Sequence, residues 1–291
     1  MTGLAITLVL LSAGAHAGWN FLAKRSSTPE VFTWWLTVAG GVLALPVAAY
    51  LLITDPPTVT GWWFIAATVT LHTGYFFTLG RAYRHGDLSI VYPAARGGGI
   101  VLIPVLAVLF LGETMAWSAA AGTGLIVAGI FCIGLSSRGG NALSGLKHSI
   151  FQPGFLYAMA TGLIIAAYSV VDKEGVQHVT PFLYMFMLST GGGLGMLALI
   201  SRHYPLATFK AEAMRHPRSI VAGAVLQYAA YVLVLSAFRL SPVSYVGPFR
   251  EVGIVFGVAL AAFILRERVT KARLAGVGAV ATGAAAIALS P

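Results

Sequence analysis

Charged residues are scarce in this chain. Only 9% of its 291 residues are Asp, Glu, Lys or Arg, whereas 58% are hydrophobic. A typical soluble domain carries about 25% charged residues, so this chain has too little polar surface to cover a water-soluble fold. The composition therefore excludes a soluble globular protein and indicates an integral membrane protein.

Cysteine and several catalytic motifs are also missing. The chain has one cysteine, Cys132, which excludes an intrachain disulfide and a cysteine-based zinc site. It contains no Gly-x-x-x-x-Gly-Lys-Ser/Thr phosphate loop, no His-Glu-x-x-His motif and no Gly-x-Ser-x-Gly elbow. We therefore expect neither an ATP-driven pump nor an enzyme, and no metal or cofactor.

Lysine and arginine outnumber acidic residues by 18 to 9, for a net charge of +9. Such an excess is also typical of proteins that bind nucleic acids. Here the basic residues lie between apolar runs, where charges that flank membrane spans are found. The sequence thus predicts contact with a lipid bilayer and no nucleic acid partner.

The apolar runs are long enough to cross a membrane, which takes about 20 residues. Ten segments approach that length: 3–22, 32–53, 61–80, 88–111, 115–135, 153–171, 181–201, 219–238, 244–265 and 271–290. The sequence predicts an all-α polytopic membrane protein with ten transmembrane helices, in a multi-pass arrangement typical of a bacterial inner membrane.

The two halves of the chain resemble each other. Residues 71–98 align with residues 226–253, and a one-residue slip extends the match. The aligned pairs include Arg84 with Arg239, Pro93 with Pro248, Gly98 with Gly253, Glu113 with Glu267, Gly122 with Gly276, and Gly129 with Gly283. We therefore predict two five-helix repeats, over residues 1–136 and 153–291. Because five is odd, the second repeat enters the membrane from the opposite side, as in many secondary transporters.

Basic residues concentrate in alternate connections, which predicts an orientation. They are Lys24, Arg25, Arg81, Arg84, Arg138, Lys147, Arg202, Lys210, Arg215, Arg218, Arg266, Arg268, Lys271 and Arg273. The opposite connections hold only Lys173 and Arg239. The positive-inside rule places the richer face in the cytoplasm and both termini outside.

Several motifs resemble those of EamA-type members of the drug/metabolite transporter superfamily. They are residues 16–20 (HAGWN) with Lys24, residues 81–93 (RAYRHGDLSIVYP), residues 111–113 (LGE) and residues 249–251 (FRE). The resemblance covers essentially the whole chain. It implies two inverted five-helix repeats around a central cavity, with the last two helices of each repeat as scaffold, and alternating access for small metabolites. It also implies cytoplasmic termini, opposite to the charge argument, so both orientations stay open.

Three charged residues lie several residues from either end of a predicted span, where each costs about 2.5 to 3.5 kcal/mol unless it finds a partner or water. They are Arg96, Arg250 and Glu251. The repeat alignment places Arg96 opposite Glu251, which predicts a pair near the pseudo-twofold axis. That pair has either a structural role, fastening the two halves, or a role in substrate or proton binding. Arg250 remains as a surplus cation, which favours a substrate with a carboxylate or phosphate.

Further polar and aromatic residues recur at helical spacing and predict inward-facing stripes. The candidate substrate-binding residues among them are His16, Trp19, Asn20, His72, Tyr75, Tyr92, Tyr168, Gln227 and Tyr231. The histidines are either ligands or interhelical hydrogen-bonding contacts, and the aromatic residues are either pocket walls or packing. For proton coupling, the first candidate is Glu251 and the alternative is His72.

Small and acidic residues suggest structural roles. Three Gly-x-x-x-Gly motifs, at residues 14–18, 191–195 and 253–257, predict close helix packing. Pro93 and Pro248 predict weakened backbone hydrogen bonding near the buried charges. Glu113 and Glu267 precede the fifth and tenth segments, where a carboxylate stabilises a helix start.

The combined features favour a secondary active transporter that exports a small polar or amphipathic metabolite, with amino-acid-like compounds the favoured class. Two rival functions stay open. One is a flippase for lipid-linked sugars, and the other is a non-transporting sensor or an intramembrane enzyme. Both a monomer and a homodimer are compatible with the sequence.

Overall fold

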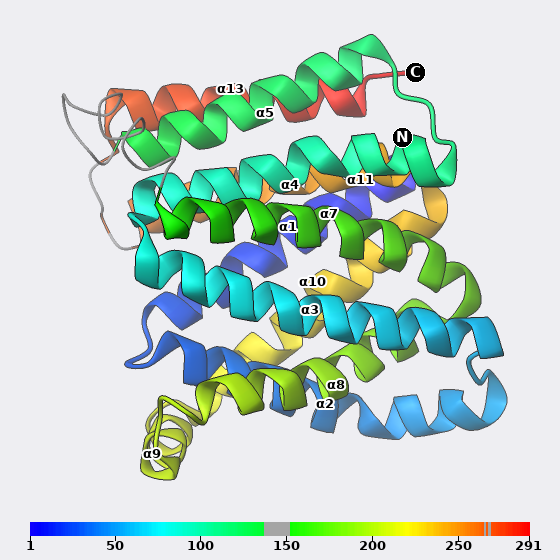
Figure 1. Ribbon diagram of the computed structural model, residues 1–291, viewed down its shortest axis with the longest axis vertical. Helices are drawn as coiled ribbons and strands as arrows, with labels where there is room; N and C mark the ends of the chain where they lie inside the picture. The colour runs from blue at the N-terminus through cyan, green and yellow to red at the C-terminus, as the bar shows by residue number, and fades with distance from the viewer. Residues whose placement is uncertain (137–151, 265, 267–268) are drawn as a thin grey trace.

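The computed structural model describes residues 1–136, 152–264, 266 and 269–291, and every regular element in these ranges is a helix (Figure 1). Four residues named above, Arg138, Lys147, Glu267 and Arg268, lie outside the described residues. The helices are α1 (Gly3–Lys24), α2 (Pro29–Thr54), α3 (Val59–His85), α4 (Leu88–Leu111), α5 (Trp117–Leu135), α7 (Pro153–His178), α8 (Pro181–Ile200), α9 (Leu206–Arg215), α10 (Pro217–Leu240), α11 (Val243–Phe249), the 3₁₀ turn η2 (Arg250–Val252), α12 (Gly253–Phe263) and α13 (Lys271–Ala288).

Eight of the ten predicted segments are helical and apolar enough to cross a membrane. The two others, α3 and α13, are helical but more polar. Helix α3 contains Thr68 and His72 and ends near Arg84, and α13 begins at Lys271 and includes Arg273. The part of the chain that the structure describes is thus all-helical, as in a multi-pass membrane protein, and the crossings by α3 and α13 stay predictions.

Local sequence explains where these helices begin. Four start at a proline, whose fixed φ and missing N–H suit the first helical position: Pro29, Pro153, Pro181 and Pro217. In three others a threonine hydroxyl accepts a hydrogen bond from a first-turn N–H: Thr2, Thr58 and Thr270. Helix α4 ends at Gly112, whose φ of 64° is the left-handed conformation that glycine adopts without strain.

The predicted segment 244–265 is not one continuous helix. It is divided into α11 and α12 by the 3₁₀ turn η2, which contains Arg250 and Glu251. Pro248 lacks an N–H and weakens the helix just before this turn. Helix α4 contains Pro93 and stays continuous, so the helix is interrupted in only one of the two aligned segments.

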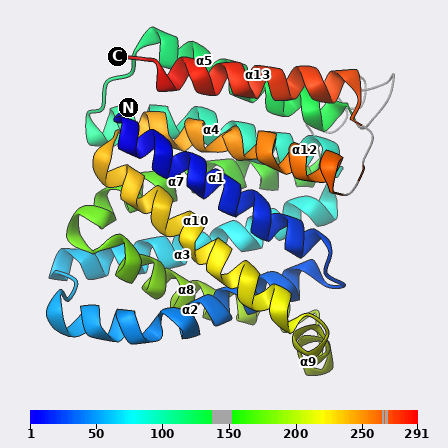
Figure 2. The same cartoon turned by 180° about the vertical axis from the view of Figure 1, so that it is seen from behind.

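The long helices run side by side, with both termini at the same end of the bundle (Figures 1 and 2). Helices of the first half pack mainly against helices of the second half. Helix α5 packs on α13 and α2 packs on α8, while α4 and α3 both contact α7. In the same way α12 and α10 both contact α1. If each helix is replaced by the corresponding helix of the other half, every contact in this set becomes another contact of the same set. An inverted repeat would produce this pattern, and the repeat itself stays a prediction.

Helices α5 and α13 come closest at two glycine pairs. A Cβ on Gly122 would lie 2.6 Å from the Gly283 backbone oxygen, and one on Gly129 would lie 2.6 Å from the Gly276 oxygen. Close packing was predicted instead at three Gly-x-x-x-Gly motifs, and only residues 191–195 pack tightly at both glycines. In the other two motifs, one glycine meets nothing within 4 Å. Spacing alone does not show which glycine faces a neighbouring helix.

We expect Gly129→Ala to destabilise the protein by about 1 to 3 kcal/mol, because the added methyl group forces α5 and α13 apart. The matched control is Gly124→Ala on the same helix, where a Cβ meets nothing within 4 Å. That change should be neutral or stabilising by up to about 1 kcal/mol, since alanine favours helix. Thermal unfolding of the purified variants measures both effects. Equal melting temperatures for the two variants would contradict the glycine contact.

Glu113 stabilises a different helix from the one predicted. Its two carboxylate oxygens accept hydrogen bonds from the backbone N–H groups of Val243 and Ser244, each at 2.9 Å. It therefore caps α11, in the other half of the chain, whereas α5 begins only at Trp117. The expectation that Glu113 stabilises the start of the fifth segment is wrong, because the chain turns at Gly112 and directs the side chain towards α11.

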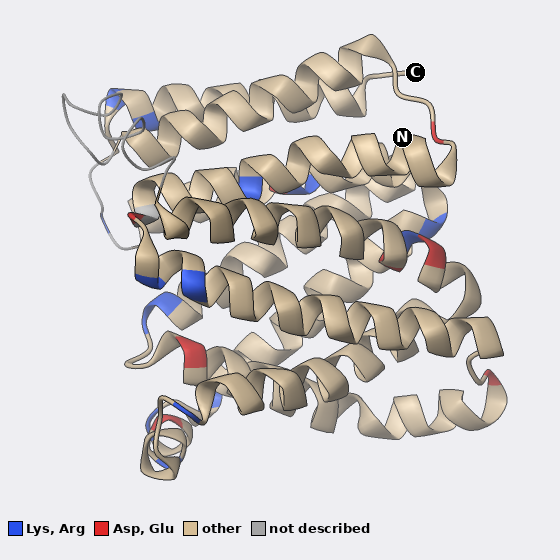
Figure 3. Ribbon diagram, viewed as in Figure 1, with Lys and Arg blue, Asp and Glu red and all other residues tan. Residues whose placement is uncertain are grey.

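Lysine and arginine are unevenly distributed between the two ends of the bundle. Most of those drawn in blue lie at the end opposite the termini (Figure 3). At the end that carries the termini, Lys173 donates hydrogen bonds to the backbone oxygens of Phe238 and Ser241, near the C-terminus of α10. This uneven distribution agrees with the concentration of basic residues in alternate connections of the sequence. The orientation in the membrane stays a prediction.

Candidate functional site

Arg96 and Glu251 meet between the two halves of the chain. Arg96 lies on α4 and Glu251 on η2, and the distance from Arg96 Nη1 to Glu251 Oε1 is 3.8 Å. The Glu251 side chain is only 4% exposed and that of Arg96 is 19% exposed. In such surroundings each charge needs the other, because removing one partner leaves a buried charge without compensation.

Arg250 is adjacent to this pair. It is half-buried, and its charge acts on Glu251, Arg96, Tyr168 and Tyr231. In the part of the chain that the structure describes, no carboxylate oxygen lies within 4 Å of Arg250. A guanidinium has five N–H donors in a planar fork that suits a carboxylate or phosphate. Arg250 is therefore available to bind an anionic group.

Aromatic rings lie close to these charges. The His72 ring stacks on Tyr168 with centroids 4.2 Å apart, and Tyr75 meets the same tyrosine edge-on at 6.1 Å. On α1, Trp19 Nε1 donates to His16 Nδ1 at 3.2 Å. The charge of Arg250 acts on His16 and Tyr75 as well as on Tyr168. The structure thus brings together residues from α1, α3, α7 and η2.

Two predicted site residues, Asn20 and Gln227, have other surroundings, and a third, Tyr92, lies at the edge of the site. Asn20 is exposed, and its Nδ2 donates to the backbone oxygen of His16 on its own helix. Tyr92 is 37% exposed and interacts with Arg96 and Tyr75. Gln227 accepts a hydrogen bond from Thr37 of α2 at 3.3 Å. Gln227 aligns with His72 in the repeat, but the two side chains have different partners.

Asp172 was not among the candidate substrate-binding residues, although its spacing from Thr161 and Tyr168 placed it on a predicted inward-facing stripe, and it is completely buried. Its carboxylate accepts hydrogen bonds from three hydroxyl groups, at 2.6 Å from Thr68, 2.8 Å from Tyr184 and 2.5 Å from Tyr231. The sequence prediction ended this helix at residue 171, whereas α7 continues to His178. The signal that reveals Asp172 is its four-residue spacing from Tyr168, which places both side chains on one face.

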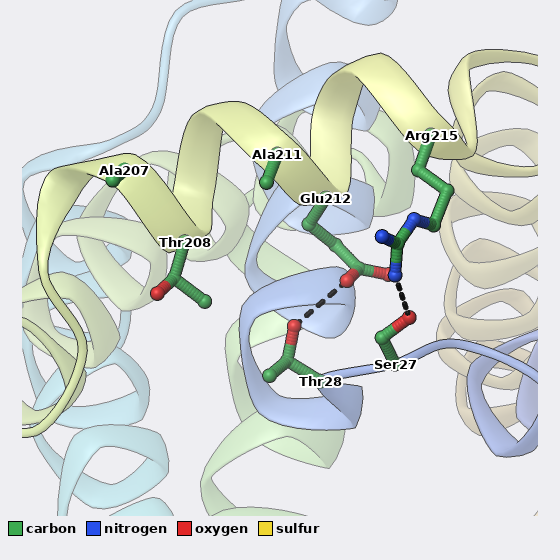
Figure 4. Close-up of a pocket in the computed structure, with 7 residues that line it drawn as sticks. All are labelled: Ser27, Thr28, Ala207, Thr208, Ala211, Glu212 and Arg215. Atoms are coloured by element: carbon green, nitrogen blue, oxygen red, sulfur yellow. Dashed lines mark hydrogen bonds between the residues drawn. The ribbon is translucent and has the colours of Figure 1, made fainter.

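A separate pocket of about 340 Å³ lies between the α1–α2 connection and α9 (Figure 4). Its lining consists of Ser27, Thr28, Ala207, Thr208, Ala211, Glu212 and Arg215. Thr28 donates to Glu212 at 2.7 Å, and Arg215 donates to Ser27 at 2.8 Å. None of the predicted site residues lines this pocket, so it is distinct from the predicted central site.

Comparisons with known proteins identify the chain. The model of the EamA-like transporter family matches residues 3–135 and again residues 152–289. A solved structure, titled only as the crystal structure of a protein, is 18% identical with a TM-score of 0.71, and the match covers 98% of this chain and 97% of that one. None of the curated proteins compared with the chain matches it. The chain therefore belongs to the EamA-like transporter family, within the drug/metabolite transporter superfamily, and is a multi-pass membrane transporter of that type.

Proposed function

We propose that the protein is a secondary active transporter that exports a small metabolite across a bacterial inner membrane by alternating access. The observation that carries this proposal is Arg250, a half-buried cation whose charge acts on the Arg96–Glu251 pair and on the rings of Tyr168 and Tyr231. A buried cation is costly in a membrane protein, and an anionic ligand compensates that cost. If the buried charges served only to hold the two halves of the chain together, the Arg96–Glu251 pair would be sufficient and Arg250 would not be needed.

The surroundings of Arg250 suggest the chemical class of the substrate. Its guanidinium group fits a carboxylate, and the rings of Tyr168 and Tyr75 offer apolar surface for the rest of the molecule. A small amphipathic acid, such as an amino-acid-like compound, satisfies both features. His16 and Trp19 lie on the α1 side of the same charge and complete the proposed contact surface.

The 3₁₀ turn η2 suggests how the site changes between its two states. It joins α11 to α12 where Arg250 and Glu251 lie, so a change in the angle between these helices moves both charges. Proton coupling through Glu251 or through His72 drives export in this proposal. Glu251 is tied to Arg96, whereas His72 contacts Tyr231 on α10, so each of the two links one half of the chain to the other.

Ligand binding tests the substrate proposal directly. A thermal-shift screen of the purified protein against small carboxylic acids and amino acids should find stabilising ligands. A ligand at about one hundred times its Kd stabilises the folded state by about 2.7 kcal/mol. Arg250→Gln should weaken carboxylate binding by about ten- to hundredfold, because a hydrogen bond to a charged group contributes about 1.5 to 3 kcal/mol.

Arg239→Gln is the matched control, since this arginine is exposed at the end of α10. Equal affinities for the two variants would rule out Arg250 as the anion site. Flux of the identified ligand into or out of proteoliposomes then separates the rival functions. Movement of lipid-linked sugars instead of the ligand indicates a flippase, binding without flux indicates a sensor, and conversion of the ligand indicates an enzyme.

A further inference from the structure

The two oxygens of Asp172 have different partners. Oδ1 accepts hydrogen bonds from Thr68 at 2.6 Å and Tyr184 at 2.8 Å. With two donors on Oδ1, its acceptor capacity is filled, so an added proton on Asp172 has to reside on Oδ2. Oδ2 faces the Tyr231 hydroxyl at 2.5 Å, a distance typical of a hydrogen bond between a hydroxyl and a charged oxygen.

His72 contacts the same Tyr231 hydroxyl. Its Nδ1 lies 2.9 Å from the backbone oxygen of Thr68. Nδ1 also lies 3.1 Å from the Thr68 hydroxyl, whose hydrogen is donated to Asp172 Oδ1. A carbonyl oxygen only accepts hydrogen bonds, so we assign a hydrogen to Nδ1, which donates it to the Thr68 carbonyl oxygen. The other ring nitrogen, Nε2, lies 3.1 Å from the Tyr231 oxygen. Tyr231 therefore stands between Asp172 and His72 in a continuous chain of hydrogen-bonding atoms.

This hydrogen-bond network contains two contacts that each need one hydrogen. One is between Asp172 Oδ2 and the Tyr231 oxygen, and the other is between the Tyr231 oxygen and His72 Nε2. The Tyr231 hydroxyl supplies a single hydrogen. If Asp172 is ionised and His72 is neutral, the Tyr231 hydrogen forms only one of the two hydrogen bonds. In the other contact, the lone pairs of two acceptor atoms face each other. An unfilled contact between buried polar atoms is costly. With one additional proton, both contacts become hydrogen bonds and that cost is removed.

We propose that Asp172, Tyr231 and His72 hold one exchangeable proton between them, and that this proton is the one coupled to transport. In one form the proton is on Asp172 Oδ2, which donates to the Tyr231 oxygen, while Tyr231 donates to His72 Nε2. In the other form both hydrogens have shifted, so that Asp172 is ionised and His72 is the imidazolium. The coupling to transport rests on the proposed function, whereas the shared proton does not.

The proton controls a contact between the two halves of the chain. Asp172 is on α7, Tyr231 on α10 and His72 on α3. When the proton leaves, the Tyr231 hydrogen stays with the charged carboxylate, because hydrogen bonds to ions are stronger than those to neutral groups. The contact between Tyr231 and His72 then has no hydrogen. Release of the proton therefore loosens α3 from α10 and leaves α7 attached to α10.

Groups on several other helices contact Asp172, Tyr231 or His72, or act on them through their charge. Tyr168 of α7 stacks on the His72 ring, and Tyr184 of α8 donates to Asp172. Arg250 of η2 acts on both His72 and Tyr231. Burial and the positive charge of Arg250 oppose an additional proton on His72, and the negative charge of Asp172 favours it. The shared proton is thus held between opposing charges, as an exchangeable proton requires.

Spectroscopy of the purified protein in lipid nanodiscs tests the shared proton without any substrate. The readouts are ¹⁵N NMR of labelled histidine and the infrared band of protonated carboxyl groups, followed from about pH 5 to about pH 8. With 7 histidines in the chain, the His72→Gln variant assigns the His72 signal, and Asp172→Asn assigns the carboxyl band. We expect one protonation step that both of these variants remove.

Two tyrosine variants form the matched comparison, because both hydroxyls bond Asp172 and only that of Tyr231 also contacts His72. Tyr231→Phe should abolish the shared step, so that any remaining titration of Asp172 and of His72 occurs independently. Tyr184→Phe should retain it. Size-exclusion chromatography and melting curves establish that each variant is folded, and an unfolded Tyr231→Phe is replaced by the Asp172→Asn comparison.

The shared proton is overturned if Asp172 stays ionised and His72 stays neutral over the whole range. It is also overturned if the two groups titrate separately in the wild-type protein, or if Tyr184→Phe removes the step as completely as Tyr231→Phe. A wild-type protein that moves its ligand and lacks the shared step refutes this inference and leaves the proposed function intact. A shared step in a protein that moves no solute refutes the proposed function alone.

Discussion

Glu251→Ala is expected to abolish transport and to destabilise the protein by about 3 to 5 kcal/mol, because it leaves the Arg96 guanidinium buried without its counter-charge. Arg96→Ala should have the same effect through the isolated carboxylate, which is only 4% exposed. Denaturant or thermal unfolding of the purified variants measures the loss of stability, and flux into proteoliposomes measures transport. Asp55→Ala, which removes an exposed carboxylate, is the control and should change both by little.

A double-mutant cycle isolates the pair from other effects of each substitution. The double variant Arg96→Ala/Glu251→Ala should lose less stability than the sum of the two single variants, since neither charge is then left alone. The charge-swapped double variant should recover folding more than transport, because the pair would form again while the charges facing a ligand are exchanged. Additive single effects would refute the pairing.

His72→Gln is expected to abolish accumulation of the ligand driven by a pH difference, while exchange of labelled for unlabelled ligand at equal pH survives. Glutamine retains hydrogen-bonding groups near Tyr231 but cannot take up a proton. Proteoliposomes loaded with the ligand found by thermal shift allow both rates to be measured in one preparation. The separation between the two rates is the expected signature of a coupling group, and a merely structural residue lowers both together.

Glu251→Gln provides the comparison between the two candidate coupling groups. Because it leaves Arg96 without its partner, it should reduce accumulation and exchange in parallel. If Glu251→Gln instead removes accumulation alone, and His72→Gln lowers both rates together, Glu251 is the coupling group and the histidine contact is structural.

The meeting of Arg96 and Glu251 was foreseeable from sequence because it depends on the repeat. Two charges inside apolar segments need partners, and the alignment placed them opposite each other. The structure brings the two side chains to 3.8 Å. The tight α5–α13 contact was not foreseen, although the alignment already paired Gly122 with Gly276 and Gly129 with Gly283. In the folded chain Gly122 instead meets Gly283, and Gly129 meets Gly276, because α5 and α13 pack antiparallel.

Asp172 and Glu113 show where sequence reasoning stopped. The four-residue spacing of Asp172 from Tyr168 predicted that its side chain faces inward, but it did not predict which groups bond it. Glu113 lies at the edge of an apolar run, where a charged residue normally reaches water, so the apolar pattern gave no reason to bury it. Asp172 is buried because α7 continues beyond the apolar run and because Thr68, Tyr184 and Tyr231 come from three other helices. Glu113 reaches the start of α11, 130 residues further along the chain.

Composition and periodicity by themselves determined that the chain is helical, lies in a membrane and carries buried charges that need partners. These properties follow from local physical chemistry, because the bilayer excludes unpaired backbone groups and unpaired charges whatever the arrangement of helices. Only the tertiary structure decided which partners these groups have. The hydroxyl groups around Asp172 and the helix capped by Glu113 are distant in sequence, and no local pattern encodes a contact that arises when separate helices pack together.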